Sequence, residues 1–171
     1  MQPKVPSIAL GAAVYTVLAL IVGFFALNAS GSAQYLTSVL CCLAAISGPA
    51  VAVWHYTSTH DLTIPAGTGA GLGAAAIVAG GLVSLAITKA LQMANVYPSD
   101  AEIMDRQRDQ LIAQGLEPEM IEQSMKMGEM MQGVGGALIN IVIAALIGAI
   151  AGAIAASVFK RGSAGDSLDS M

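Results

Sequence analysis

The chain has 171 residues, of which 56% are hydrophobic and only 11% are charged. A soluble domain carries about 25% charged residues, so a chain with this little charge lacks the polar coat that water requires. The net charge is −4 and the seven basic residues are scattered along the chain, which argues against a basic surface for nucleic acid.

The first element in chain order is an apolar run over about residues 7–27. Lys4 precedes it and small residues follow at 29–33, as in a cleaved signal peptide. Its apolar core is longer than the roughly 7–15 residues typical of such a leader. We therefore expect a retained membrane span, with a cleaved leader as the alternative.

Three further apolar runs cover about residues 35–54, 64–88 and 134–159, and none of the four runs contains Asp, Glu, Lys or Arg. A spanning helix needs about 20 apolar residues, because the hydrocarbon core is about 30 Å thick. Backbone groups in lipid must be hydrogen-bonded within the segment, so each run should be helical. The sequence predicts an all-α fold: an integral membrane bundle of four transmembrane helices, with residues 1–171 forming a single membrane domain.

His55, His60 and Asp61 lie in the polar stretch between the second and third runs. Side chains of these types can bind a metal or respond to pH. Three potential ligands in a short loop are a weak signal, and we expect interfacial polar residues with no metal site. Trp54 and Tyr56 beside them are typical of aromatic anchors at the membrane interface.

Glycines four residues apart mark the third and fourth runs. Such pairs let two helix backbones approach closely. Close packing matters in a membrane because apolar side chains gain no hydrophobic free energy when they move from lipid into a contact between helices. The pairs fit internal packing of the bundle, or a seam with a second copy or another subunit. Asn140 adds an amide, which we expect to hydrogen bond between helices. The candidate packing residues are Gly67, Gly69, Gly71, Gly73, Gly148, Gly152 and Asn140.

Residues 93–133 form the one sizeable polar stretch, and eight of the eleven acidic residues lie in it (Asp100, Glu102, Asp105, Asp109, Glu117, Glu119, Glu122 and Glu129). Ser99 and Glu102 have the spacing of a capping box, which begins a helix. Gly115 is placed to end that helix, and Pro118 to occupy the first turn of the next. We predict an extramembrane helical hairpin between the third and fourth spans.

Seven of the nine methionines also fall in this segment. Methionine adapts to varied partners, and its thioether can bind Cu(I). The other reading is an apolar face that rests on neighbouring helices or on the lipid surface. The candidate partner surface is Met120, Ile121, Met125, Met127 and Met131. No histidine lies nearby, and we expect no cofactor.

Four spans place both termini on one side of the membrane. Lys160 and Arg161 directly follow the fourth span and begin the polar C-terminal tail, residues 160–171. Basic residues next to a span favour the cytoplasmic side. We therefore expect both termini in the cytoplasm, although Arg106, Arg108 and Lys126 on the other side keep the balance close.

The order of the elements and two short stretches resemble domain-of-unknown-function family 4199, a group of small bacterial membrane proteins. The stretches are Tyr97-Pro98 after the third run and residues 115–127, with a glycine, a proline-acid pair, Ile-Glu and methionines before the last helix. The resemblance covers nearly the whole chain and implies a bacterial inner (plasma) membrane location. It brings no known activity and no catalytic residues. Members often carry basic residues after the second span, where this chain has residues 55–61.

The sequence has no Ser/His/Asp set, no paired carboxylates in the spans and no metal-ligand spacing, and its spans carry no charge. We therefore predict a multi-pass membrane protein without catalytic activity, acting as a structural, accessory or interaction component. Its expected partners are the lipid bilayer and either further copies of itself or the subunits of a membrane complex. The alternative is a small oligomeric transporter or channel.

Overall fold

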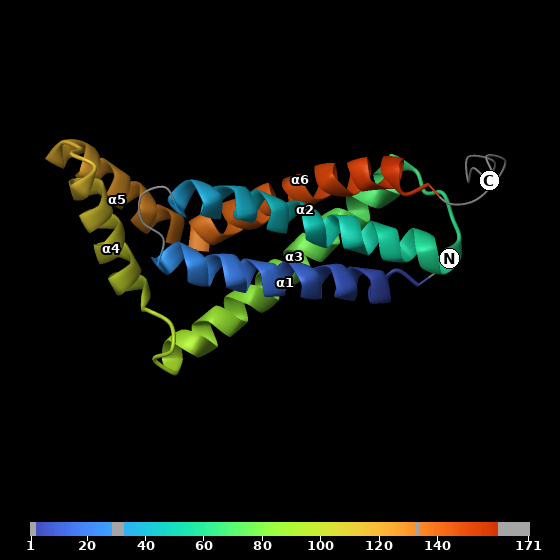
Figure 1. The fold of residues 1–171 in the computed structure, drawn as a ribbon, viewed down its shortest axis with the longest axis horizontal. Coiled ribbons are helices and arrows are strands. Elements are labelled where there is room, and N and C mark those ends of the chain that lie inside the picture. Colours follow the sequence, from blue (N-terminus) through green and yellow to red (C-terminus); the bar gives the residue numbers. More distant parts are fainter. Residues whose placement is uncertain (1–2, 29–32, 133, 161–171) are drawn as a thin grey trace. The chain divides into compact units, whose positions relative to one another are not determined.

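The computed structural model describes residues 3–28, 33–132 and 134–160. Within these ranges the chain forms six α-helices and no strand, which confirms the all-α prediction (Figure 1). The helices are α1 (Val5–Asn28), α2 (Ala33–His60), α3 (Ala66–Met93), α4 (Asp100–Ala113), α5 (Pro118–Gln132) and α6 (Val134–Val158). Most of the predicted polar tail, from residue 161 onward, lies outside the described residues.

Four of these helices, α1, α2, α3 and α6, are long and apolar enough to cross a membrane. A helix rises about 1.5 Å per residue, so the 24 residues of α1 extend about 36 Å and the 28 residues of α2 about 42 Å. Both lengths exceed the thickness of the hydrocarbon core, about 30 Å. The prediction of four long apolar helices is confirmed.

Two of the helices extend beyond the apolar runs from which they were predicted. The second and third runs were expected to end near residues 54 and 88, but α2 continues to His60 and α3 to Met93. His55 and His60 therefore lie on a helix and not in a flexible loop. The apolar run ends before the helix does, because a change of polarity does not break backbone hydrogen bonds.

Three helices end with the same backbone motif. Asp61, Asn95 and Gly115 have positive φ angles of 50°, 55° and 74°. In each case the next amide donates to a carbonyl five residues earlier: Leu62 to Thr57, Val96 to Leu91 and Leu116 to Leu111. This is the Schellman arrangement, which satisfies carbonyl groups that the helix end leaves unpaired. The expectation that Gly115 ends its helix is confirmed.

The chain divides into two compact units. The bundle unit comprises residues up to Leu85 together with Ile143 onward, and the hairpin unit comprises Ala86–Val142. The bundle unit thus contains α1, α2, most of α3 and most of α6. The hairpin unit contains the end of α3, all of α4 and α5, and the start of α6.

Helix directions in the bundle unit alternate along the chain. Gly11, near the start of α1, lies against Gly48 in the second half of α2, so these two helices are antiparallel. Gly11 also approaches Ala76 of α3, and one turn further along both helices the Thr16 hydroxyl donates to the Gly80 carbonyl over 3.0 Å, so α1 and α3 are parallel. Alternating directions are those of successive membrane crossings.

The interior of the bundle unit is built mostly from small side chains. Buried alanines include Ala12, Ala44, Ala52, Ala76, Ala151, Ala155 and Ala156, packed with a few larger residues such as Val53, Tyr56 and Leu72. Large apolar side chains instead occupy the outside, among them Val17, Ile21, Phe24, Phe25, Leu82, Ile147, Ile150 and Ile154. A soluble helix bundle has the opposite arrangement, with its large apolar side chains inside.

Helix α4 of the hairpin unit begins with a capping box, as predicted. The Ser99 hydroxyl accepts from the Glu102 amide, and the Glu102 carboxylate accepts from the Ser99 amide. Pro118 is the first residue of α5, where its missing amide hydrogen costs nothing. Helices α4 and α5 contact each other, and Gly128 of α5 lies against the Met104 side chain of α4.

Candidate functional site

The closest backbone contact in the bundle unit lies between α3 and α6. A Cβ atom added to Gly69 would lie 2.5 Å from the Gly152 carbonyl oxygen and 2.5 Å from the Ala156 Cβ. One added to Gly73 would overlap the Gly148 carbonyl oxygen. Real Cβ contacts essentially never fall below 3.0 Å, so these positions admit only glycine while the helices stay this close. The structure brings four of the candidate packing residues together in one seam.

The overlapping pair Gly67 and Gly71 lies elsewhere. An added Cβ at either position meets nothing within 4 Å. Successive residues of an α-helix are about 100° apart, so Gly67 and Gly71 lie about 200° around the helix from Gly69 and Gly73. Only one of the two pairs can face α6, and sequence spacing alone does not say which.

Three further glycines, Gly11, Gly48 and Gly80, make close contacts and were not among the candidate packing residues. A Cβ on Gly11 would lie 2.6 Å from the Gly48 carbonyl oxygen, which joins α1 to α2. A Cβ on Gly80 would lie 2.8 Å from the Ala12 carbonyl oxygen, which joins α3 to α1. None of these glycines has another glycine four residues away, so the search for glycine pairs missed them. Alanine or serine does lie at that spacing, as at Ala44 and Ala52 beside Gly48, and this is the signal that could have found them.

Asn140, the remaining candidate packing residue, is not in this seam. It lies at the second position of the apolar stretch Ile139–Val158, and its side chain is exposed. The structure therefore gives no support to an interhelical role for its amide within the bundle unit.

A partly buried polar contact joins α1 to α2 near the start of the chain. Ser7 is only 1% exposed, and its Oγ lies 2.9 Å from Nδ1 of His55. Thr57 is fully buried and donates to the Trp54 carbonyl on its own helix. The Ser58 Oγ is buried without a partner among the described residues. This end of the bundle unit thus holds more hydrogen-bonding groups than its own helices satisfy.

The two histidines do not converge on a common site. His55 contacts Ser7, whereas the His60 ring packs edge-on against Tyr56, with ring centroids 5.0 Å apart. Over the described part of the chain, no group of three or more His, Cys, Asp or Glu side chains is arranged to hold a metal ion. Tyr56 is 5% exposed, so the expectation that it anchors at the interface is wrong, whereas Trp54 is 44% exposed.

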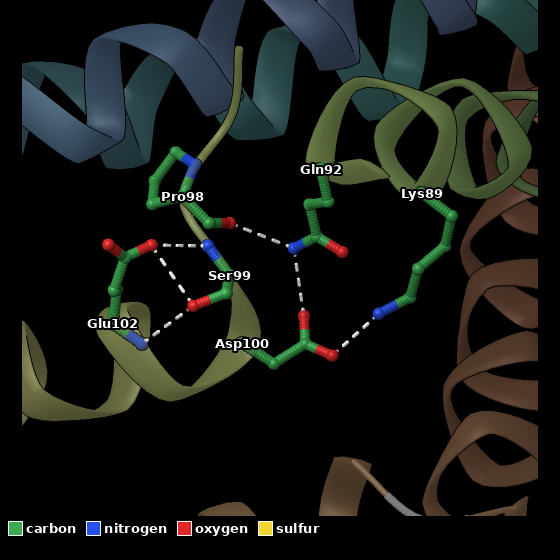
Figure 2. Close-up of polar contacts among 6 residues, drawn as sticks. All are labelled: Lys89, Gln92, Pro98, Ser99, Asp100 and Glu102. Atoms are coloured by element: carbon green, nitrogen blue, oxygen red, sulfur yellow. Dashed lines mark hydrogen bonds and ion pairs between the residues drawn. The ribbon is translucent and has the colours of Figure 1, made fainter. Parts of the chain in front are cut away.

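In the hairpin unit, a polar network ties the end of α3 to the start of α4 (Figure 2). The Lys89 ammonium pairs with one carboxylate oxygen of Asp100, and the Gln92 amide donates to the other over 2.9 Å. Gln92 also donates to the Pro98 carbonyl over 3.0 Å. These contacts hold the start of α4 to the last turns of α3.

This network changes the titration of two carboxyl groups. Hydrogen bonds from Lys89 and then Gln92 lower the pKa of Asp100 below its ordinary value. The pKa of Glu102 is lowered first by the Ser99 backbone amide and then by the Ser99 hydroxyl. Both carboxyl groups therefore remain ionised at a lower pH than an ordinary carboxyl group does.

A groove of about 920 Å³ runs between α4 and α5. Its residues come from one face of each helix, spaced three or four apart. The apolar side chains of its lining are Ala101, Met104, Ile112, Leu116, Pro118, Ile121 and Met125, and the charged ones are Asp100, Asp105, Arg108, Glu122 and Glu129. The groove is therefore lined by both apolar and charged side chains, and four of its five charged residues are acidic.

The predicted partner surface on α5 is distributed over more than one environment. Ile121 is 9% exposed and Met125 is half-buried, and both line the groove. Met120 and Met127 are 51% and 63% exposed and do not line it. The side chain of Met131 lies outside the described residues. Sequence reasoning missed the acidic residues of α4, which face the same groove from the other helix.

No family model, no curated protein and no solved structure matches this chain at a significant level. Its function must therefore be inferred from its own residues.

Proposed function

We propose that this chain is a multi-pass membrane protein with a structural or accessory role. In this proposal α1, α2, α3 and α6 cross the lipid, and α4 and α5 form a hairpin outside it that contacts further copies or other subunits. The protein needs no catalytic group for this role.

One observation carries the membrane assignment. The bundle unit buries glycine, alanine, serine and threonine and exposes large apolar residues such as Phe24, Ile150 and Ile154. In water this arrangement would expose a large apolar surface that favours aggregation. In lipid it is favourable, because helices associate through close packing of small residues while the large apolar ones meet acyl chains.

The charge of the hairpin unit supports its place outside the lipid. Residues 100–132 hold eight acidic and three basic side chains. A charged side chain at the centre of a bilayer costs about 2.5–3.5 kcal/mol even on insertion scales, so a segment with eleven of them belongs in water. With the α3–α6 seam closed inside the bundle, recognition is left to the hairpin and to other exposed surfaces.

The proposed location is the bacterial inner membrane, with both termini in the cytoplasm. The resemblance to family 4199 supports this membrane, and Lys160 supports the orientation because it lies two residues beyond the end of α6. The hairpin would then lie on the periplasmic side.

Crosslinking in native membranes tests the accessory role. A photoreactive side chain is placed at Met127, which is exposed on α5, and the protein is then extracted in mild detergent. The matched control carries the photoreactive side chain at Ile150, on the exposed apolar face of α6. We expect a discrete higher-mass product with the Met127 probe that is absent with the Ile150 probe. A strictly monomeric protein without any co-purifying subunit would contradict the proposal.

A small oligomeric transporter or channel is the second candidate. The partly buried pair of Ser7 and His55 favours this candidate, together with the Ser58 hydroxyl, which is buried without a partner among the described residues. Polar groups inside a membrane bundle often line solute paths. This candidate predicts ion or proton flux in liposomes that is lost in the His55→Leu variant. Absence of flux for any tested ion or small solute would remove it.

A further inference from the structure

The groove between α4 and α5 has the chemistry of a helix-binding site. Its apolar part includes Met104 and Met125, whose flexible thioether side chains can adjust to different apolar groups. Ile112 lines the groove and is 55% exposed, so part of its apolar surface is available to a partner. Amphipathic helices are commonly bound in such grooves through apolar residues at i, i+3 or i+4, and i+7.

The charge around the groove restricts what can occupy it. Asp105, Glu122 and Glu129 line the groove and are exposed, and Arg108 is the one basic residue among the described residues of its lining. Asp100 also lines it but is already paired with Lys89. The net negative charge of the lining favours a basic partner, because complementary charges steer association and juxtaposed like charges oppose it.

The same charge disfavours the other candidates for occupant. A second copy would bring another acidic hairpin, and anionic lipid headgroups would meet the same repulsion. The chain's own C-terminal residues 162–171 contain two aspartates and no basic residue. A basic partner from another protein is the occupant that remains.

We propose that the α4–α5 groove binds a basic amphipathic helix of a partner protein. The partner's apolar face lies on Met104, Ile112 and Met125, and its lysine or arginine side chains pair with Asp105, Glu122 and Glu129. This inference rests on the proposed accessory role and names the partner class for the hairpin.

Peptide binding to the full-length protein in nanodiscs of zwitterionic lipid tests the groove. The probe is a fluorescent 18-residue helix with leucine on one face and lysine on the other. Its controls are a scrambled peptide of the same composition and a peptide with glutamate in place of lysine. We expect saturable binding of the probe only, measured by fluorescence anisotropy, and weaker binding at higher salt because exposed charge pairs are screened.

Two triple variants separate the groove from general negative charge. The groove variant carries Asp105→Asn, Glu122→Gln and Glu129→Gln, and the matched control carries Asp109→Asn, Glu117→Gln and Glu119→Gln. All six residues are exposed, so both variants should fold, and both lose the same charge. We expect the groove variant to raise the Kd about tenfold or more, and the control to raise it less than about threefold.

Several outcomes would overturn the inference: no binding of the lysine peptide, equal binding of the scrambled peptide, or equal losses in the two triple variants. Failure here is distinguishable from failure of the accessory role. If peptide binding fails while the Met127 probe still yields a crosslinked product, the hairpin has a partner but the groove is not its basic-helix site. If both fail, the accessory role falls as well.

Discussion

The Ser7 hydroxyl on α1 lies 2.9 Å from Nδ1 of His55 on α2, 48 residues later in the chain. Ser7 is almost fully buried, so neither water nor headgroups can replace this contact easily. It lies at the same end of the α1–α2 pair as the core formed by Val53, Tyr56 and Ile64. The contact therefore fixes how the first two helices meet.

Removing this hydroxyl should loosen the α1–α2 pair. We expect Ser7→Ala to lower the free energy of unfolding by about 1 kcal/mol, because Nδ1 of the half-buried His55 loses its partner. The measurement is the thermal unfolding midpoint in detergent. Ser157→Ala is the control, since the exposed Ser157 hydroxyl bonds only to the Ala153 carbonyl of its own helix. Equal effects of the two substitutions would show that the interhelical contact contributes nothing specific.

Alanine substitutions at Gly73 and Gly71, two nearby glycines of α3, should change stability differently. At Gly73 the new Cβ overlaps the Gly148 carbonyl, so α3 and α6 must separate, and we expect a loss of about 1–3 kcal/mol. At Gly71 the Cβ meets open space, and alanine favours a helix over glycine, so stability should be unchanged or slightly higher. Unfolding of the two variants in the same detergent gives the comparison. A Gly71→Ala variant as unstable as Gly73→Ala would contradict the assigned seam.

Features set by local chemistry could be predicted from the sequence. Ser99, Gly115 and Pro118 act on their own helices, and each lies where its residue type indicated. The ends of α2 and α3 were missed because Asp61 and Asn95 take the positive φ that is usually left to glycine. Asp and Asn adopt it more readily than other non-glycine residues, which is the signal that could have located both ends.

Features set by distant contacts could not be predicted. The Ser7–His55 pair and the approach of Gly80 to Ala12 depend on which helix faces meet, and one sequence does not fix helix rotation. For the same reason the sequence could not separate Gly69 from Gly71. The groove could not be predicted either, because its acidic lining residues come from both α4 and α5 and one sequence does not show which faces of the two helices meet.

Acid should weaken the start of α4. The pKa of Asp100 is lowered in the folded chain from its ordinary 3.8, first by Lys89 and then by Gln92. A carboxyl group whose pKa is lower in the folded chain stabilises the fold at pH values above its pKa in the unfolded chain. This stabilisation is lost as the pH falls through the pKa of the folded chain. We therefore expect full protection of the first turn above about pH 4 and progressive loss below it. The effect should stay below about 1 kcal/mol, because both side chains are about half exposed.

Hydrogen exchange of the amides at residues 102–104 measures this loss, expressed as protection factors between pH 3 and pH 6. The double variant Asp100→Asn/Glu102→Gln removes both carboxyl groups whose pKa is lowered and should abolish the pH dependence. Asp109→Asn, in the middle of the exposed face of α4, should retain it. Unchanged pH dependence in the double variant would mean that other groups control the helix start.

Cysteine labelling should place the hairpin and the C-terminus on opposite sides of the membrane. The native thiols Cys41 and Cys42 are free and exposed, so both are first replaced by alanine. Single cysteines are then introduced as Gln107→Cys on α4 and Lys160→Cys after α6, two exposed positions. With cytoplasmic termini, a membrane-impermeant maleimide should label the Gln107→Cys protein in intact spheroplasts. The Lys160→Cys protein should be labelled only after lysis.

One span, α6, separates Gln107 from Lys160, so the two cysteines should lie on opposite sides of the membrane. Labelling of both cysteines from the same side would contradict this. Reversed accessibility would keep the four spans and reverse the orientation.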